Sequence, residues 1–499
     1  MVLFVRLIND RSIIVQESRI FLLVISSVSA VSRHFYAICM MFWKLISVIV
    51  LVLAVGTTLL LNGAFHEAPE APAYGDGWWG KGEKPTTPPD ESISPFKIKF
   101  DESALSDLKS RIRNARFAEG LEDSQFHYGV RPEYMRKVAK YWMNSYNWTK
   151  KEKEINKYDH FKTNIEGIDV HFMHIKPNLP PGQKAIPLMM IHGWPGSFYE
   201  FMKIAPMMTD PLAHGGPSDD AFELVCPSIP GYTFSEGSHK KGLNALAVAR
   251  IFDKLMKRLG FNQYYIQGGD WGAYIVTKMA LISPTSILGL HANMAVTRVP
   301  FQPLLLAIGS YFPSLILSSK EDQDKVFPAG DHFFDFLLET GYMHIQATKP
   351  DTLGHALNDS PIGLAAYILE KFSTWTNRKG RDADDGCIEE NWTLDEILTN
   401  VMLYWMTNSI TTSMRFYKEN IAGAFQEPLY EITVPSAFAD FPMELRHVPE
   451  PWTRKQFTDL VQYTTMPRGG HFAAFEVPQL LAKDIRKFVK AVEARRKKS

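Results

Sequence analysis

Short apolar runs alternate with amphipathic stretches through the middle of the chain. A stretch with helical spacing covers residues 243–259, and a second helix is expected over 273–282, ending near Pro284. Apolar runs of strand length occupy residues 187–191, 222–227, 264–268 and 287–291. Strands that alternate with helices in this way are typical of βαβ units. The pattern therefore predicts an α/β fold with a doubly wound, mostly parallel sheet.

The pattern differs on either side of this region. Helical spacing is predicted over 103–116 and 132–146, where Pro132 suits the first turn. Between 300 and 425 the sequence is helical and interrupted by prolines, before strand-like residues 432–438 and 460–466 and a terminal helix over 479–495. An insertion in an α/β core commonly forms a lid over a pocket. We therefore expect a core in two parts, 161–299 and 426–499, and a helical lid over 300–425.

The N-terminal region has a different character. Residues 45–61 form a run of 17 residues without charge, extended by Met40 to Trp43, which reaches the lower limit for a membrane span. A cleaved signal is the alternative, but residues 62–65 make a poor cleavage site. We predict a transmembrane anchor over 40–62. Residues 1–39 form an extension of uncertain status, and 63–160 form a linker and wrapping region that is rich in Gly, Pro and Trp over 75–89.

Composition narrows the classes of partner. The 54 Lys and Arg residues balance the 54 Asp and Glu residues, and no basic groove laced with aromatic residues occurs, so nucleic acid is not expected. The three cysteines, Cys39, Cys226 and Cys387, are widely spaced. That spacing disfavours both a disulfide framework and a structural zinc site.

The residues Gly268-Gly269-Asp270-Trp271-Gly272 follow a predicted strand and precede a predicted helix. Their small side chains permit the tight turn of a nucleophile elbow, with Asp270 at the position that a serine hydrolase gives to its hydroxyl. The motif alone is weak, because an Asp at a helix start is usually an N-cap. Its context makes Asp270 a candidate nucleophile.

An Asp nucleophile favours a particular reaction. An unperturbed Asp, with a pKa near ~3.9, is already an anion at neutral pH and can attack carbon without a base. The product is an ester with the enzyme, which water must then hydrolyse with the help of a base. We therefore expect carbon electrophiles such as epoxides or alkyl halides as substrates.

The segment His192-Gly193-Trp194-Pro195-Gly196-Ser197 follows the strand over 187–191 directly. In this loop an HG-x motif, together with the residue after the nucleophile, supplies backbone N–H donors to an oxyanion. The expected donors are Trp194 and Trp271. An ordinary Gly/Pro turn is the alternative interpretation.

The candidate base is His471, in a glycine-containing loop between the last strand and the last helix. The acid that orients it should precede it in the chain, and Glu444 fits, with Asp440 as a close rival. Opening of an epoxide also needs a proton donor, for which a phenol is suited. Tyr342 and Tyr417 lie in the expected lid, although the pattern alone does not select them among 19 tyrosines.

From about Met41 to Lys498 the chain resembles the microsomal epoxide hydrolase family of α/β hydrolases. The resemblance rests on long motifs that occur in the same order: DGWWG at 76–80, HGWPGSFYEF at 192–201, QGGDWG at 267–272, GYMHIQ at 341–346, LNDSPIGLAAYILEKFST at 357–374, FYKEN at 416–420 and RGGHFAAFE at 468–476.

The resemblance implies the α/β-hydrolase fold and assigns roles to five residues: Asp270 as nucleophile, Glu444 and His471 as activators of water, and Tyr342 and Tyr417 as donors to the epoxide oxygen. It favours Glu444 over Asp440. It further implies an N-terminal wrap, an anchor in the endoplasmic reticulum membrane, and hydrolysis of xenobiotic and lipid epoxides to diols without a cofactor or a metal.

Several alternatives remain open at this level. Residues 1–39 have no counterpart in the family pattern. Arg33 and Lys44 precede the anchor and acidic residues follow it, which favours a lumenal catalytic part, whereas the family implies a cytosolic one. A juvenile-hormone epoxide hydrolase, a haloalkane dehalogenase and a non-catalytic binder of hydrophobic ligands are the alternative functions. The oligomeric state is not predicted.

Overall fold

The computed structural model describes residues 69–498, except 215, 217–219 and 425–426, together with residues 40, 43, 44 and 47. The expected extension over 1–39 and all but those four residues of the expected anchor over 40–62 lie outside the described residues. Among the residues that are described, no helix is both long enough and apolar enough to cross a bilayer.

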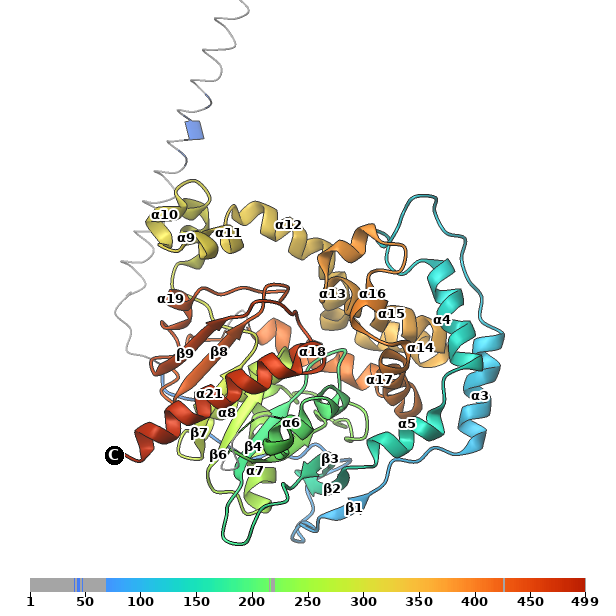
Figure 1. Cartoon of the computed structure of the whole chain (residues 1–499), viewed down its shortest axis with the longest axis horizontal. Helices are drawn as coiled ribbons and strands as arrows, with labels where there is room; N and C mark the ends of the chain where they lie inside the picture. The colour runs from blue at the N-terminus through green and yellow to red at the C-terminus, as the bar shows by residue number, and fades with distance from the viewer. Residues whose placement is uncertain are drawn as a thin grey trace, which may run out of the picture. The chain divides into compact units, whose positions relative to one another are not determined.

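The fold is built on a nine-stranded sheet with the order β1-β2-β3-β5-β4-β6-β7-β8-β9 (Figure 1). Its parallel part contains β4 (Ile186–Ile191), β5 (Phe222–Pro227), β6 (Tyr264–Gly268), β7 (Ile287–Ala292), β8 (Ser436–Asp440) and β9 (Leu460–Thr465). In the sheet β4 lies between β5 and β6, so the chain adds β5 on one side of β4 and β6 on the other. At such a point the loops that follow neighbouring parallel strands diverge and leave room for a site.

One edge of the sheet differs from the mostly parallel arrangement that the apolar runs predict. Here β1 (Ser94–Phe96), β2 (Asp159–Ile165) and β3 (Ile168–Ile175) pair antiparallel with one another, and β3 pairs antiparallel with β5. The sheet is therefore mixed. Glu166 and Gly167 connect β2 to β3, both with positive φ (54° and 86°), as the tightest hairpin turns require. The expected boundary at 160/161 falls inside β2.

The predicted strand over 432–438 is displaced by four residues at its start. Ile432 forms only an isolated bridge with Phe457, and the regular strand β8 begins at Ser436. Pro435, directly before it, has no N–H to offer to the sheet. Proline therefore separates the apolar run into a bridge and a shorter strand.

Two groups of helices pack against the sheet. The helix α7 (Ala245–Arg258) packs on α8 (Trp271–Ile282), and α6 (Ala205–Thr209) packs on α21 (Pro478–Arg496), which crosses in front of the strands in Figure 1. The side chains of α8 are buried over nearly its whole length. The helix that starts at the expected nucleophile is thus fixed by the core.

Between β7 and β8 the regular elements among the described residues are all helical. They are α9 (Gln302–Gly309), α10 (Pro313–Ile316), α11 (Lys320–Val326), α12 (Ala329–Glu339), α13 (Gly341–Thr348), α14 (Pro350–Asp359), α15 (Pro361–Thr374), the 3-10 turn η3 (Arg378–Asp382), α16 (Ile388–Asn391), α17 (Leu394–Thr407) and α18 (Ile410–Ala424). We call this insertion the cap. Within it, α13 and α14 both pack on α18.

The region before β2 contributes contacts to both the cap and the core. The helices α3 (Glu102–Arg113) and α4 (Pro132–Asn144) pack on α15, and α5 (Trp148–Ile155) follows them. Upstream, the Trp79 indole donates to Glu166 Oε2 at 2.8 Å, and Arg250 on α7 donates to both Glu166 oxygens at 2.7 and 2.8 Å. This buried carboxylate ties the N-terminal segment to the core.

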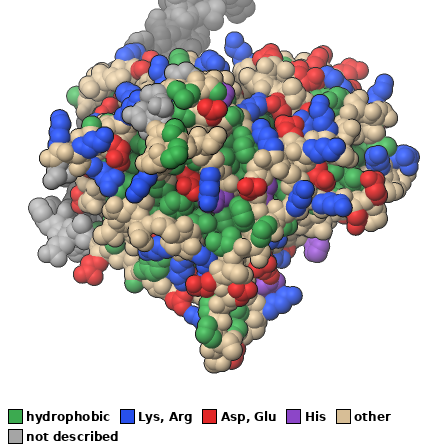
Figure 2. All heavy atoms as spheres, turned by 60° about the horizontal axis from the view of Figure 1, so that its bottom comes forward, with side chains coloured by type: hydrophobic (Ala, Val, Ile, Leu, Met, Phe, Trp, Pro, Cys, Tyr) green, Lys and Arg blue, Asp and Glu red, His purple; other side chains and the backbone are tan. Residues whose placement is uncertain are grey.

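Acidic and basic side chains are mixed over the face of the molecule that Figure 2 displays. This mixing agrees with the balance of 54 basic and 54 acidic residues in the sequence. The face carries no extended surface of one sign that would attract a polyanion.

Candidate active site

Asp270 lies at the turn between β6 and α8, at the carboxyl edge of the sheet. Its backbone has φ 51° and ψ −124°, a strained conformation of the kind that holds a nucleophile above a sheet. The turn needs small neighbours, because a Cβ at Gly272 would lie 2.0 Å from the Ile191 carbonyl oxygen. Strain and close packing together fix the carboxylate in the position that the motif predicts.

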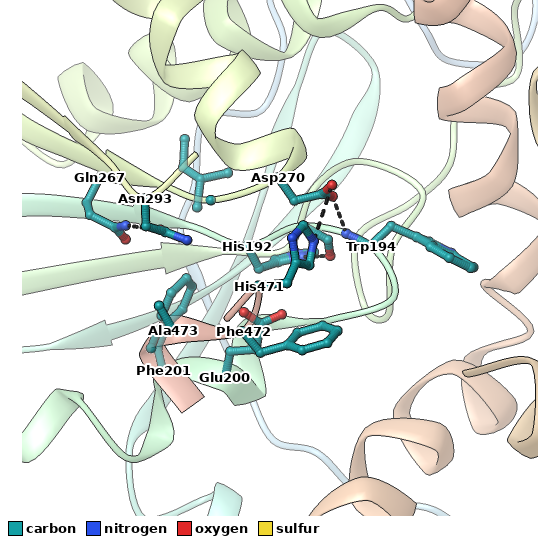
Figure 3. A pocket seen from close by; sticks show the side chains of 14 residues that line it. His192, Trp194, Glu200, Phe201, Gln267, Asp270, Asn293, His471, Phe472 and Ala473 are labelled. Carbon is teal, nitrogen blue, oxygen red and sulfur yellow. Dashed lines mark hydrogen bonds and ion pairs between the residues drawn. The ribbon is translucent and has the colours of Figure 1, made fainter. Parts of the chain in front are cut away.

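The loop after β4 brings one of the two expected backbone donors to Asp270. The N–H of Trp194 donates to Asp270 Oδ1 at 2.8 Å (Figure 3). The structure gives no such hydrogen bond from the Trp271 N–H to Asp270. Trp271 is the first residue of α8, where an N–H has no partner within the helix and stays available to a ligand. Trp194 therefore holds Oδ1, and its N–H does not contact Oδ2.

His471 lies in the loop after β9, between two carboxylates. Its Nδ1 is 2.6 Å from Glu444 Oε1, and its Nε2 is 3.5 Å from Asp270 Oδ2. The His471 and Glu444 side chains are each 2% exposed, so these interactions take place away from bulk water. The structure thus brings together the three residues that the sequence places far apart.

The charges around His471 set its protonation. Burial alone would lower its pKa, but the negative charge of Glu444 and the hydrogen bonds to Asp270 and Glu444 outweigh burial and raise the pKa of His471 well above 6.5. The ring is therefore a cation at neutral pH as long as Asp270 is an anion. A histidine in this state cannot act as a base until one of its two negative partners is neutralised.

Asp440, the rival of Glu444, is engaged elsewhere. Its Oδ2 accepts from Lys325 Nζ at 2.9 Å, and its Oδ1 is 2.7 Å from His447 Nδ1. These contacts belong to α11 and to the loop after β8. Asp440 therefore pairs with a different histidine, and Glu444 is the acid that contacts His471.

Tyr342 on α13 and Tyr417 on α18 face the core from the cap. The Tyr342 ring stacks on the Trp194 ring with centroids 5.0 Å apart and planes 5° apart, and the Tyr417 ring meets the Trp271 ring edge-on at 4.8 Å. The two tyrosine rings are 5.7 Å apart. The cap thereby places both phenols over the residues that flank Asp270.

Both phenols are suited to donating a hydrogen bond. Burial, with a further contribution from the charge of Asp270, raises the pKa of Tyr342 and of Tyr417 well above 10.0. The Tyr417 hydroxyl is buried and has no hydrogen-bond partner among the described residues. An unpartnered buried hydroxyl is costly, so a substrate oxygen that accepts from it would relieve that cost.

Sequence reasoning missed two residues of this site. The first is Glu200, which lines the pocket that also contains Asp270, His471, Gln267 and Asn293. In Figure 3 its carboxyl group points toward the His471 ring. Burial raises the pKa of Glu200 to about 8, against the opposing effect of the His471 charge. The signal was the motif itself, since Glu200 is part of HGWPGSFYEF.

Gly196 makes room for the Glu200 carboxyl. A Cβ at Gly196 would lie 1.3 Å from Glu200 Oε1. The second missed residue is Trp375, whose fully buried ring meets the His471 ring edge-on at 4.9 Å and whose carbonyl accepts from the His471 N–H at 3.1 Å. Nothing in the local sequence marks Trp375, because the packing of the cap on the core, and not a local motif, brings it to His471.

His192, beside the nucleophile, has a scaffold role. Its Nε2 accepts from the Ile229 N–H at 3.1 Å, so Nδ1 carries the proton that is donated to the Gly193 carbonyl at 2.9 Å. Burial lowers the pKa of His192 to about 4. This neutral ring joins the loops after β4 and β5. It does not compete with His471 for protons. No group of three or more His, Cys, Asp or Glu side chains able to hold a metal ion occurs among the described residues.

Two family descriptions match the chain. Residues 93–201 match the family described as "Epoxide hydrolase N terminus", and residues 186–444 match the "alpha/beta hydrolase fold". The chain is 52% identical to Epoxide hydrolase 1 of Sus scrofa, over 84% of this chain and 93% of the relative, and 45% identical to Juvenile hormone epoxide hydrolase 1 of Ctenocephalides felis, over 86% and 92%.

A solved structure agrees with these matches. The crystal structure of juvenile hormone epoxide hydrolase from the silkworm Bombyx mori superposes with a TM-score of 0.79 at 42% identity, covering 84% of this chain and 99% of that chain. The N-terminal match ends on the loop that contains Trp194 and Glu200, and the core match contains Asp270 and Glu444. The chain therefore belongs to the epoxide hydrolase family of α/β hydrolases.

Proposed function

We propose that this protein hydrolyses xenobiotic and lipid epoxides to vicinal diols through a covalent ester on Asp270. One observation carries the proposal: the Asp270 carboxylate lies beside the His471–Glu444 pair, and two protonated phenols pack on the Trp194 and Trp271 rings next to it. A haloalkane dehalogenase shares the Asp nucleophile but needs donors to a halide instead of two phenols. The phenol pair is the feature that favours an epoxide.

In the first step Oδ2 of Asp270 attacks an epoxide carbon, because Oδ1 is held by the Trp194 N–H. A new Oδ2–carbon bond forms as the carbon–oxygen bond of the ring breaks. Tyr342 and Tyr417 donate hydrogen bonds to the departing oxygen, and one of the two phenols protonates it to give the first hydroxyl group of the diol. The proton that His471 releases when the Asp270 charge is lost restores that phenol. General acid assistance of this type typically accelerates a reaction by ~10²–10⁴-fold.

In the second step a water attacks Cγ of the ester. His471 accepts the proton of the water, and Glu444 stabilises the imidazolium that results. The Trp194 N–H, with the available Trp271 N–H, stabilises the oxyanion on Oδ1. The Cγ–Oδ2 bond then breaks, and the leaving oxygen takes the proton of the new Cγ–OH group. The diol therefore leaves with an oxygen from Asp270, the enzyme regains a carboxylate that contains an oxygen from water, and His471 is again protonated beside it.

The change of charge on Asp270 times the two steps. Before alkylation the Asp270 anion helps to keep His471 protonated. Formation of the ester removes that negative charge, so the pKa of His471 falls and the ring becomes a base at the moment when a base is needed. The change of His471 from a cation to a base therefore needs no event other than alkylation of Asp270.

Glu200 is the residue best placed to orient the hydrolytic water. It lines the pocket beside His471, and its raised pKa of about 8 keeps the carboxyl neutral at neutral pH. A neutral carboxyl beside His471 orients water without adding a second negative charge that would hold the imidazolium. We assign it a positioning role in the second step.

The range of substrates is part of the proposal. Relatives named epoxide hydrolase 1 are 51–52% identical to the chain, and relatives named juvenile hormone epoxide hydrolase are 42–45% identical. We propose broad action on hydrophobic epoxides, as in the first group. Competition between styrene oxide and an epoxide of a long terpenoid ester separates the two: a strong preference for the terpenoid would place the protein in the second group.

We further propose that residues 40–62 anchor the protein in the endoplasmic reticulum membrane. The support is the uncharged run over 45–61 in the sequence. Release of the full chain from microsomes by alkaline carbonate would contradict an anchor. The sequons at Asn147, Asn358 and Asn391 report the orientation, since a glycan on any of them would place the catalytic part in the lumen.

The decisive test is the intact mass of a His471→Gln variant after brief mixing with styrene oxide. We expect a stable adduct of one substrate on Asp270, because alkylation does not need the base and hydrolysis does. The matched control is His239→Gln, an exposed histidine paired with Glu236, which should turn over without an adduct. Binding of styrene oxide without an adduct would contradict the hydrolase proposal and support the alternative function of a non-catalytic binder.

A further inference from the structure

Residues 299–319, at the start of the cap, contain no Asp, Glu, Lys or Arg over 21 positions. This segment includes α9 and α10, which pack on each other. Four of its large side chains are nevertheless exposed: Phe301 at 42%, Tyr311 at 78%, Phe312 at 62% and Leu315 at 76%. A surface segment of this length without charge is unusual, because each exposed apolar side chain costs free energy in water.

The helix α12, which contacts α9, adds to the same apolar surface. Phe333, Phe334, Phe336, Leu337 and Leu338 are each at least 43% exposed. Ten of the fifteen exposed large hydrophobic side chains in the described part of the chain fall between residues 301 and 345. We call the exposed side chains of α9, α10, α12 and the turns between them the apolar rim. Figure 1 shows these helices following one another along the upper edge of the cap.

The amphipathicity of α12 is the reverse of that expected for a helix in water. Two of its three acidic residues, Asp335 and Glu339, are partly covered and pair with Arg381 at 3.3 and 2.7 Å, whereas Asp331 in the first turn is exposed. The Thr374 hydroxyl also donates to Glu339, at 2.7 Å. A soluble helix turns its apolar stripe to the core and its charges to water. Here Asp335 and Glu339 pair with Arg381 on the covered side, while the Phe and Leu side chains are exposed.

We propose that the apolar rim lies in the surface of a lipid bilayer as a monotopic membrane contact, separate from any N-terminal anchor. The helices are too short to span a bilayer, since α9 has 8 residues, α10 has 4 and α12 has 11. They match helices that lie in the interface with their apolar side chains among the acyl chains. Burial of Phe, Leu and Tyr there removes the cost of exposing them to water.

The length of the chain before the described residues favours a bilayer over a second copy as the occupant. Seven residues, 62–68, separate the apolar run predicted to enter a membrane from the start of the continuous described chain. Seven residues reach about 25 Å at full extension. If the run enters a membrane, the catalytic unit therefore stays within about one domain diameter of the lipid.

The position of the apolar rim also suits the proposed function. Entry of the substrate from the lipid rests on that function, whereas the membrane contact itself does not. The helix α12 contacts α13, which carries Tyr342 and the partly exposed Ile345. A rim in the bilayer would place the helix of one epoxide-oxygen donor beside the lipid phase. Hydrophobic epoxides dissolve in that phase, so substrate would reach the cap from lipid.

The test uses the full chain with Cys39→Ser, because Cys226 and Cys387 are buried. A fluorophore is attached to the Leu315→Cys variant, in the apolar rim, and to the matched Tyr128→Cys variant, which is 81% exposed but outside it. Both proteins are reconstituted in neutral phosphatidylcholine vesicles that carry a quencher on the acyl chain. We expect quenching on Leu315→Cys that is several-fold stronger than on Tyr128→Cys, with little dependence on salt, since the contact is made by apolar side chains and the vesicles are neutral.

Equal quenching at the two positions would overturn the proposal. So would protection of the Leu315→Cys fluorophore that rises with protein concentration in the absence of vesicles, because that result would make a second copy the occupant. Diol formation from styrene oxide by both labelled proteins reports that each is folded. The fluorescence readout does not depend on that activity, so failure of the membrane contact and failure of the proposed function are distinguishable.

Discussion

Nε2 of His471 lies 3.5 Å from Oδ2 of Asp270, which is close enough for an ion pair. Alkylation of Oδ2 removes the negative charge and so breaks this pair. The charge of Asp270 therefore affects the protonation of His471. The carboxylate raises the pKa of the imidazole, and loss of the carboxylate charge in the ester returns the imidazole to a basic form.

The first prediction concerns the pH dependence of stability. The pKa of His471 is raised on folding, so the pair stabilises the protein fully below the unfolded pKa of ~6.5 and loses this contribution as pH rises through the higher folded pKa. Asp270→Asn removes one partner. We expect wild type to exceed Asp270→Asn in thermal midpoint at pH 6, and the difference to shrink at high pH. A difference that grows with pH would contradict the pairing.

The second prediction concerns the phenols. Tyr342→Phe combined with Tyr417→Phe should slow alkylation by about 10²–10⁴-fold, because no acid remains for the epoxide oxygen. Hydrolysis of a preformed ester should be unchanged. Rapid-quench measurement of the adduct resolves the two steps. The control is Tyr367→Phe, a cap tyrosine whose ring also contacts Trp194 but whose hydroxyl pairs with Gln346; an equal loss there would make the effect one of packing.

The third prediction tests the positioning role of Glu200. Its pKa of about 8 means that the carboxyl is neutral below that pH and becomes an anion beside His471 above it. The wild-type rate of ester hydrolysis should therefore change around pH 8. Glu200→Gln resembles the neutral form, so it should retain hydrolysis at pH 7 and lose this change.

Glu200→Ala should slow hydrolysis at every pH, while alkylation stays near the wild-type rate. Glu476→Gln is the control for the titration, since burial raises the pKa of Glu476 to about 7 and its carboxylate accepts from the Gly470 N–H. If Glu476→Gln removes the change near pH 8 and Glu200→Gln does not, the assignment to Glu200 is wrong.

The fourth prediction concerns the elbow. Gly272→Ala places a methyl group 2.0 Å from the Ile191 carbonyl oxygen, which belongs to the backbone and cannot move aside. The variant should lose about 2–4 kcal/mol of unfolding free energy in a denaturant titration. Gly423→Ala, in α18 with no atom within 4 Å of the added Cβ, should instead stabilise by up to about 1 kcal/mol.

The fifth prediction concerns the N-terminal wrap. Glu166 is 2% exposed and neutralises Arg250 and Lys254 while it accepts from Trp79. Glu166→Gln leaves the buried Arg250 guanidinium without its anion, so we expect a loss of about 3 kcal/mol in unfolding free energy. Glu236→Gln, at an exposed pair with His239, should change it by less than about 1 kcal/mol. A similar loss in both variants would contradict the argument from burial.

Local sequence carries much of the parallel core. The strands β4, β5, β6 and β7 coincide with their apolar runs to within one residue at each end, because a strand covered on both faces is continuously apolar and short. The antiparallel edge strands were missed, since β2 is half-covered and polar residues interrupt it. The start of β8 was displaced by Pro435, which has no N–H to offer to the sheet. This proline is visible in the sequence, but the prediction gave more weight to the apolar residues around it.

The sequence by itself made Asp270 the candidate nucleophile, because small residues flank it between a predicted strand and a predicted helix. It also determined the candidates for the acid and the base. The family resemblance already favoured Glu444 over Asp440, and the tertiary structure shows the contact of Glu444 with His471. Only the tertiary structure decided that Glu200 lines the pocket of Asp270, that Trp375 contacts His471, and that α12 exposes its Phe and Leu side chains. Each of these depends on contacts between segments far apart in the chain, and local spacing does not encode which distant segment a side chain will meet.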